Sequence, residues 1–383
     1  MKMAQETPSA INNTKEAFLY TAFELSNTKW KLAFSDGNKF RLVSIESGDL
    51  PRLQIELENA KKRFKLDEDI RVVSCYEAGR DGFWLHRYLA SCGIENLIVD
   101  SASIEVDRRK RRAKTDRIDA SKLLRMLMRY HGGEKKLWAI VRVPSVEDED
   151  ARHIGRELDV LKRERTSKRN RIKGLLIQQG LRVNNPSNKK FLQELTSFRT
   201  WDGREVSTDL KARVEMEYKR LRLVEDQIGI LEKEKKERLK EPNTESLRKV
   251  NQLLLLRGIG SVSSWNFVME FFGWREFSNR KEVGALAGLT PTPYDSGGSV
   301  HEQGISKAGN KRIRALSVEI AWAWLRFQPN SKLSHWYMKK FGHGGKRLRR
   351  IGIVALARQL LIALWRYLEN GVVPEGACIK PIA

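Results

Sequence analysis

Apolar residues at the start of the chain occur in short runs of strand length. Such runs cover residues 17–25, 30–34 and 40–45, and turn residues separate them, as at 35–37. Runs of this kind between turns are typical of antiparallel strands. The pattern therefore predicts three antiparallel strands, preceded by a frayed, disordered tail over residues 1–16, which are polar and without periodicity.

From residue 49 to residue 128, segments in which apolar residues recur at helical spacing alternate with short apolar runs of strand length. We predict a helix over 49–65, a strand over 70–75, a helix that carries 83–89, a strand over 97–99 and a helix over 115–128. The full order is strand, strand, strand, helix, strand, helix, strand, helix. This order is that of the ribonuclease-H-like α/β fold, whose first and fourth strands lie side by side at the sheet centre. Residues 17–144 are predicted to form such a domain.

Long charged helices follow over residues 145–242. Leu221, Val224, Ile228 and Leu231 have the a/d spacing of a coiled coil, with Glu and Lys around them. We therefore predict a coiled-coil arm, interrupted by a loop near residues 184–187. After Pro242 the pattern is mostly helical to about residue 370, so residues 243–383 are predicted to be a mostly α-helical C-terminal domain.

The charge of the chain indicates a polyanionic partner. Its 383 residues contain 72 Lys and Arg against 48 Asp and Glu, a formal net charge of +24. The two common partners of such a chain are nucleic acid and an anionic membrane. The apolar stretch 351–364 is interrupted by Arg358 and Gln359 and is shorter than the roughly 20 residues of a membrane span. We therefore expect nucleic acid and no membrane.

Cysteine usage and the N-terminus fit a cytoplasmic protein. Cys75, Cys92 and Cys378 are odd in number and show no CxxC spacing, which argues against a disulfide framework and a zinc site. The first thirty residues contain no secretory signal.

Four acidic residues of the first domain stand where its elements end or begin. Glu24 ends the first predicted strand, Glu77 follows the fourth, and Asp116 and Asp119 begin the last helix. The spacing i, i+3 places both aspartates on one helical face. If the four carboxylates converge, they need cations, and their hard oxygens select Mg²⁺ or Mn²⁺, which can activate the attack on a phosphodiester.

Each acid also has an ordinary structural interpretation. Asp116 and Asp119 can serve as the capped start of a helix, where acids complement the helix dipole. Glu24 and Glu77 can be solvated loop residues. Their joint placement favours a metal site.

Two basic runs are candidates for gripping phosphates. The run directly before the acidic pair holds Arg108, Arg109, Lys110, Arg111, Arg112 and Lys114, and the arm carries Lys168, Arg169 and Arg171 in a second run. Charge runs are often solvated faces, but a basic run beside a carboxylate cluster suits nucleic-acid binding.

The C-terminal region contains two glycine-rich motifs. Residues 256–261 have the pattern of a helix-hairpin-helix turn that contacts a phosphate, and a plain helix connection explains them equally well. Ser296 precedes Gly297 and Gly298, which allow a nucleic-acid backbone to approach closely. A serine hydroxyl needs a base or a nearby cation to become a nucleophile, and His301 or a metal ion is the candidate. Judged by composition alone, the segment around Ser296 is an ordinary Ser/Gly loop.

The chain resembles the DEDD-type transposases of bacterial insertion sequences, which are described as bridge-RNA-guided recombinases. The motifs that carry the resemblance are CYEAGRDGFWL around Glu77, AKTDRIDA around Asp116 and Asp119, and GLTP, SGG and GISKAGN near Ser296. One departure from the family is Glu24, at a position that is commonly Asp. The resemblance covers nearly the whole chain.

The resemblance implies a RuvC-like domain, a coiled-coil arm and a helical transposase domain with a catalytic serine. It implies metal ligation by the four acids and a composite active site in a homo-oligomer, a dimer or a tetramer. It also implies a structured guide RNA that pairs with donor and target DNA, and a phosphoserine intermediate at Ser296, with Ser299 and Ser306 as rival nucleophiles. Further nucleic-acid contacts are expected from Lys307, Asn310, Lys311 and Arg312.

Two other functions compete with this one. A RuvC-like junction nuclease would use water as the nucleophile, and its serine would be dispensable. A non-enzymatic nucleic-acid scaffold would need neither the acids nor the serine. The tryptophans Trp322, Trp324, Trp336 and Trp365 could stack on unpaired bases, but their helical spacing favours packing in a core.

Overall fold

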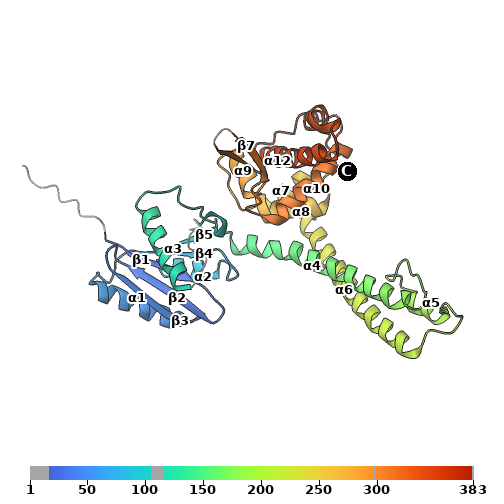
Figure 1. Ribbon diagram of the computed structural model, residues 1–383, viewed down its shortest axis with the longest axis horizontal. Helices are drawn as coiled ribbons and strands as arrows, with labels where there is room; N and C mark the ends of the chain where they lie inside the picture. Colours follow the sequence, from blue (N-terminus) through green and yellow to red (C-terminus); the bar gives the residue numbers. More distant parts are fainter. Residues whose placement is uncertain (1–16, 105–115, 297–298, 382–383) are drawn as a thin grey trace, which may run out of the picture. The chain divides into compact units, whose positions relative to one another are not determined.

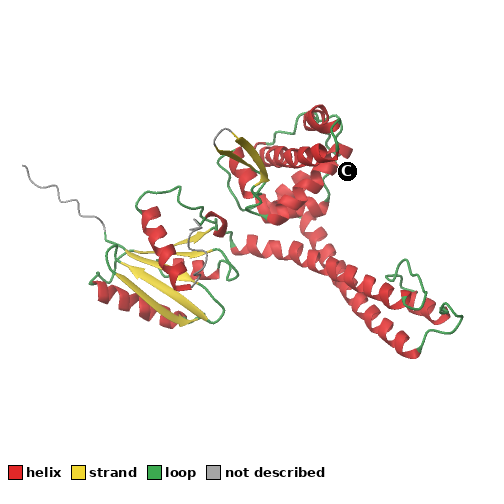
Figure 2. Cartoon of the chain, viewed as in Figure 1, coloured by secondary structure: helices red, strands yellow, loops and turns green. Residues whose placement is uncertain are grey.

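The computed structural model describes residues 17–104, 116–296 and 299–381. The chain divides into two compact units, Met1–Val143 and Pro144–Ala383. The first is a mixed α/β unit, and the second is mainly helical with one short strand pair (Figure 2). Each unit is described by itself.

The first unit contains a five-stranded sheet in the order β3-β2-β1-β4-β5. The strands are β1 Leu19–Glu24, β2 Lys29–Ser35, β3 Phe40–Glu46, β4 Val72–Glu77 and β5 Glu95–Val99. β1 pairs antiparallel with β2 and parallel with β4. The prediction that the first and fourth strands are neighbours at the sheet centre is confirmed.

Helices cover both faces of this sheet (Figure 1). On one face α1 (Leu50–Phe64) and α2 (Trp84–Ser91) bury an apolar cluster that includes Phe23 and Tyr76. On the other face α3 (Asp116–His131) packs Ala120, Leu123 and Leu124 against Ala22 and Cys75. Because strand side chains alternate between faces, odd positions of β1 face α1 and α2, and even positions face α3.

Two long antiparallel helices open the second unit. They are α4 (Val146–Ile177) and α6 (Thr208–Lys240), and the short α5 (Phe191–Ser197) lies near the turn between them (Figure 1). Ser145 and Ser207 cap their N-termini by accepting backbone N–H bonds from Asp148 and Leu210. The predicted a/d residues Leu221, Val224 and Ile228 are buried, and Leu231 is partly buried. Supercoiling itself stays a prediction.

The remaining helices enclose one apolar core. They are α7 Glu245–Leu254, α8 Ser261–Phe267, α9 Arg280–Leu286, α10 Lys311–Phe327, α11 Lys332–Tyr337 and α12 Lys346–Asn370, with π-helical turns at Val268–Phe272 and Met338–Gly342. Trp324 is fully buried in this core and Trp365 packs against it, as predicted. Trp322 differs, because 48% of its surface is exposed.

Helix α12 is long and apolar enough to cross a membrane by length and composition alone. In the structure its middle serves the core instead, since Leu356, Leu360 and Leu364 are almost completely buried against neighbouring helices. A core helix of a water-soluble fold passes the same test of length and composition.

The segment around Ser296, for which the sequence pattern predicted no strands, contains a strand pair. It forms a hairpin of β6 (Pro291–Ser296) and β7 (Ser299–Ile305). Two prolines in β6 concealed the strand from pattern analysis, because proline lacks the N–H that a ladder uses. A two-stranded ribbon tolerates them, since the register between Pro291 and Pro293 shifts.

Candidate active site

Two of the predicted acids lie at the ends of adjacent parallel strands. Glu24 is the last residue of β1 and Glu77 is the last residue of β4. The residues before them, Phe23 and Tyr76, are register partners. Neighbouring strands lie about 4.8 Å apart, so the two glutamates emerge from adjacent strands at the same edge of the sheet.

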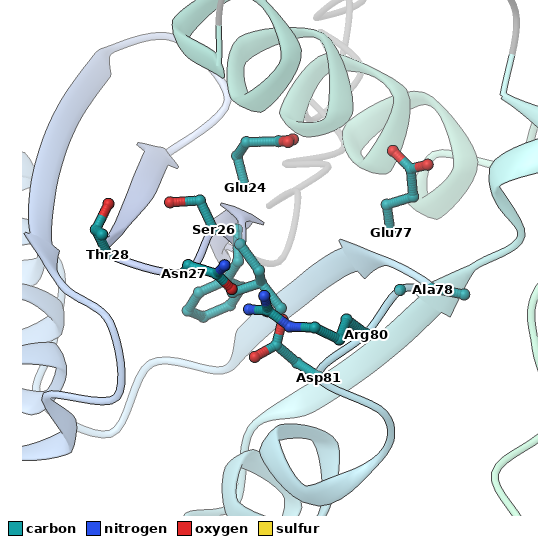
Figure 3. A pocket seen from close by; sticks show the side chains of 11 residues that line it. Glu24, Ser26, Asn27, Thr28, Glu77, Ala78, Arg80 and Asp81 are labelled. Atoms are coloured by element: carbon teal, nitrogen blue, oxygen red, sulfur yellow. The ribbon is translucent and has the colours of Figure 1, made fainter. Parts of the chain in front are cut away.

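Strand alternation directs both glutamates to the face that α3 covers. Tyr20 and Ala22 precede Glu24 on that face, and Val73 and Cys75 precede Glu77. The side chains of Glu24 and Glu77 extend from their strands to the same side of the sheet (Figure 3). The buried neighbours fix the strands, so the two carboxylates are held in place while their heads reach solvent.

Glu24 and Glu77 line one pocket. The turn after β1 contributes Ser26, Asn27 and Thr28, and the turn after β4 contributes Arg80 and Asp81. Glu77 is exposed and Glu24 is partly exposed. Parallel strands collect their following turns at one edge, which is where open α/β sheets commonly bind ligands.

The aspartate pair begins α3 on the same side of the sheet. Asp116 is the first residue of the helix, and Asp119 is partly buried one turn later, directly before the buried Ala120. The side chain of Asp116 is outside the described part of the structure. So is the whole basic run 108–114, which includes Arg108, Arg109, Lys110, Arg111, Arg112 and Lys114.

The donor atoms at this edge suit a hard divalent cation, but the described side chains do not complete a site. Carboxylate oxygens are the ligands that Mg²⁺ and Mn²⁺ prefer. Within residues 17–104, 116–296 and 299–381, no three His, Cys, Asp or Glu side chains gather closely enough to hold a metal ion. A four-carboxylate site therefore stays a prediction that depends on Asp116.

In the second unit, Ser296 is the last residue of β6 and its Cα partner is Ser299. His301 lies on β7, opposite Tyr294. The side chains of residues 293–303 and all of Gly297 and Gly298 are outside the described part. The backbone places Ser296 at the turn end of the hairpin. Ser306 follows β7 at the other end, where its N–H donates to the Thr290 carbonyl.

The GISKAGN motif anchors the base of this hairpin. The N–H groups of Lys307 and Asn310 donate to the carbonyls of Gly288 and Leu286. Gly309 has φ +91°, and a Cβ there would stand 2.2 Å from the Leu286 carbonyl oxygen. At Gly288, with φ +67°, a Cβ would stand 2.0 Å from the Ala308 oxygen. Only glycine permits this contact between the two loops.

A buried acid that the sequence analysis did not single out lies beside this anchor. Glu270, 3% exposed in the π-helical turn, accepts from Arg156 Nε and Nη2 at 2.7 and 2.9 Å. Burial alone would raise the pKa of Glu270, but the hydrogen bonds and charges of Arg156 and then Arg312 outweigh burial and lower it. The signal in the sequence was an acid inside the apolar run 267–272.

Several predicted nucleic-acid contacts have partners within the protein. Lys168 and Arg171 form ion pairs with Glu217, which is buried. Arg169 donates to the Asn185 side chain at 2.8 Å. These contacts account for the positions of all three side chains, and their role in nucleic-acid binding stays a prediction.

Among the predicted contacts after the hairpin, some side chains have partners within the protein and others are exposed. Asn310 caps α10 by accepting from the N–H groups of Arg312 and Ile313, while Lys307 and Lys311 are exposed. Arg312 is also paired with Asp159 on α4. Of the predicted contacts in this block, Lys307 and Lys311 thus present their charge to solvent.

The turn between α7 and α8 contacts its own chain. Lys380 Nζ donates to the carbonyls of Leu254 and Ile259, and Lys380 N donates to Leu255 O. Gly258 has φ +86° and lies against Phe327. These contacts support the interpretation of residues 256–261 as a plain connection between two packed helices.

The comparisons with known proteins point in one direction. Residues 250–335 match the family model described as Transposase IS116/IS110/IS902 family. The chain is 40% identical over 98% of both chains to a Sinorhizobium fredii protein named as transposase y4rJ. It is 27% identical to the transposase for insertion sequence element IS1111A of Coxiella burnetii, over 67% of each chain. For the transposase for insertion sequence element IS1328 of Yersinia enterocolitica, the identity is 25% over 60% of this chain and 66% of the relative.

Proposed function

Because this chain belongs to the IS116/IS110/IS902 family of transposases, we propose that it cuts and exchanges DNA strands through a phosphoserine intermediate at Ser296. In this proposal Glu24, Glu77, Asp116 and Asp119 form a DEDD-type site for Mg²⁺ or Mn²⁺. The first unit is then a ribonuclease-H-like, RuvC-like domain, and α4 and α6 form a coiled-coil arm.

One observation carries the proposal. Glu24 and Glu77 end adjacent parallel strands on the sheet face that also holds the start of α3. Two segments that are distant in sequence thus bring Glu24 and Glu77 to one edge, and the helix that begins with Asp116 lies on the same face. Two carboxylates that emerge from adjacent strands repel each other, and a bound divalent cation would relieve that repulsion. The same strand order supports the ribonuclease-H-like assignment.

The reaction would proceed by attack of the Ser296 hydroxyl on a DNA phosphodiester. The oxygen–phosphorus bond to serine forms, the bond to one sugar oxygen breaks, and that oxygen takes up a proton. The serine proton passes to a base, for which His301 is the protein candidate. A bound divalent ion would supply charge stabilisation for the attacking and leaving oxygens. The protein's own part is to hold the four carboxylates and to fix the hairpin that carries Ser296.

Family membership and the charge of the chain support the proposed partners. We propose donor and target DNA, a structured guide RNA and a homo-oligomer, either a dimer or a tetramer, acting in the cytoplasm. The net charge of +24 supports a nucleic-acid partner, because phosphate binding requires many cations.

Denaturing gels with labelled DNA and the guide RNA test the proposal. The wild-type protein should trap DNA covalently in the presence of Mg²⁺. Ser296→Ala should abolish the adduct, while Ser299→Ala and Ser306→Ala should retain it. If DNA with free ends still accumulates in Ser296→Ala, water is the nucleophile and the protein is a nuclease. If Asp116→Ala and Asp119→Ala leave transposition unchanged, the protein is a scaffold and the metal site does not exist.

A further inference from the structure

A concentrated cationic surface occupies the start of α12. It comprises Lys339, Lys340, Lys346, Arg347, Arg349 and Arg350, which we call the α12 cationic face. All six side chains are exposed, and they lie on either side of the turn at Gly344 and Gly345. Residues 320–368 contain no Asp or Glu. The face therefore has no acidic neighbour in its own segment.

Acids of the other described segments form no ion pair with the face either. In the parts of the chain that are described, none of the six side chains forms an ion pair. The arm differs, because Lys168 and Arg171 are paired with the buried Glu217. The positive charge of the α12 cationic face is thus available to an external anion.

The positions of these cations oppose the stability of the helix. Lys346, Arg347, Arg349 and Arg350 occupy the first turns of α12, which contain no acid. Cations are unfavourable at a helix N-terminus, and like charges at i, i+3 and i, i+4 repel each other. By contrast, the first turn of α4 contains Glu147, whose negative charge is favourable at the N-terminal end of the helix dipole. A cluster that weakens its own helix indicates an external partner of opposite charge.

Packing beneath the face holds it in place. Phe341 lies so close to Gly352 that a Cβ there would meet its ring at 2.4 Å. The Phe341 ring also contacts Trp336 and Tyr337, with centroids 5.5 and 6.0 Å apart. Arg349 Nε donates to the Gly344 carbonyl at 3.0 Å. The backbone that carries the cations is therefore fixed before a partner binds.

We propose that the α12 cationic face binds the phosphate backbone of double-stranded DNA. The choice of DNA rests on the proposed function, whereas the polyanionic partner rests on the face alone. Single-stranded nucleic acid is bound by aromatic rings on which bases stack. The rings beside the face are engaged within the protein: Trp336 contacts Lys340 and Phe341, and the Tyr337 hydroxyl donates to the Arg349 carbonyl. The face thus offers charges for phosphates and no stacking platform for bases.

The test compares two variants that lose the same charge. The first is Lys346→Gln, Arg347→Gln and Arg350→Gln, which keeps Arg349 and its bond to the turn. The matched control is Lys62→Gln, Arg63→Gln and Lys65→Gln, three exposed cations at the C-terminal end of α1, of which Lys65 is the C-cap. Affinity for a DNA duplex is measured over a range of salt concentrations in EDTA, so that no cleavage occurs.

We expect the face variant to reduce the slope of log affinity against log salt by about 3, because three phosphate contacts are lost. At physiological salt its affinity should fall about 100-fold. The control should change affinity by less than about 3-fold. Equal losses in both variants, or an unchanged slope in the face variant, would overturn the proposal.

Further measurements distinguish binding of duplex DNA from binding of other polyanions and from a folding defect. Single-stranded DNA, an RNA duplex and anionic lipid vesicles are tested with both variants, and a loss confined to any of these three would also overturn the proposal. The melting temperature of the face variant should equal or exceed that of the wild type, since repulsion at the helix start is relieved.

The test is independent of the strand exchange reaction. Duplex binding is measured in EDTA, where no strand is cut, so its result does not depend on the serine chemistry. Failure to detect a covalent adduct would refute the proposed function and leave this binding result standing. An adduct that forms normally while the face variant binds DNA with unchanged affinity and salt slope would refute the surface alone.

Discussion

The two units hold their most informative acids in opposite environments. In the first unit Glu24 and Glu77 stand at an open sheet edge and line a pocket. In the second unit, Glu270 is buried and accepts hydrogen bonds from Nε and Nη2 of Arg156. A buried carboxylate must be paired because desolvation of an unpaired charge is costly, whereas acids at an edge keep their hydration until a ligand arrives. The difference separates a binding role from a structural role.

The largest expected effect concerns the open edge. Glu77→Gln should reduce covalent adduct formation by about 1000-fold or more, because a metal ligand is lost from a unit that acts as a whole. Its melting temperature should change little, since the Glu77 side chain is exposed. Gel assays and thermal unfolding measure the two quantities. If Glu77→Gln still formed the covalent adduct at the wild-type level, the exposed acid would have no binding role that distinguishes it from the buried Glu270.

The second prediction concerns the anchor next to Glu270. Gly309→Ala should lower adduct formation by about 100-fold, because the added Cβ displaces the hairpin that carries Ser296. Gly304→Ala is the matched control: its φ is also positive, at +86°, but nothing lies within 4 Å of the Cβ. The control carries only the backbone strain of about 1–2 kcal/mol. Similar activities for the two variants would show that the contact with Leu286 does not position the serine.

The third prediction concerns the buried pair. Glu270→Gln should destabilise the protein by about 2 kcal/mol, below the usual cost of a broken buried pair because Arg156 is 45% exposed. Chemical denaturation measures the change. The double variant Glu270→Leu with Arg156→Leu should be less destabilised than Glu270→Gln, and a larger loss in the double variant would contradict a pairing role.

The smallest effect is the pH dependence of that pair. The folded protein lowers the pKa of Glu270 below its ordinary value of 4.5, because the bonds from Arg156 outweigh burial. The stability that the charge contributes is therefore fully present above pH 4.5 and is lost as pH falls through the folded pKa. The stability gap between wild type and Glu270→Gln should be constant near pH 6 and narrow in acid. A gap that widens in acid would reverse the assigned direction.

The sequence predicted the first unit well because its signals are local. Strand runs with buried alternate positions determined β1 and β4, and the fold order then made Glu24 and Glu77 neighbours. The hairpin at Ser296 was missed, since its two prolines imitate a loop and its stability comes from distant contacts such as Asn310 with Leu286. Glu270 was missed for a related reason: its partner Arg156 lies 114 residues away, beyond any local pattern.

The close contact at Gly309 has a consequence at the level of the gene. Every amino acid other than glycine carries a Cβ, so any missense change in this codon meets the Leu286 carbonyl. Only silent substitutions leave the encoded contact intact. Among diverging copies of the element, those that remain mobile should therefore differ at this codon in its third base alone, and a missense change there should mark a copy that has ceased to move.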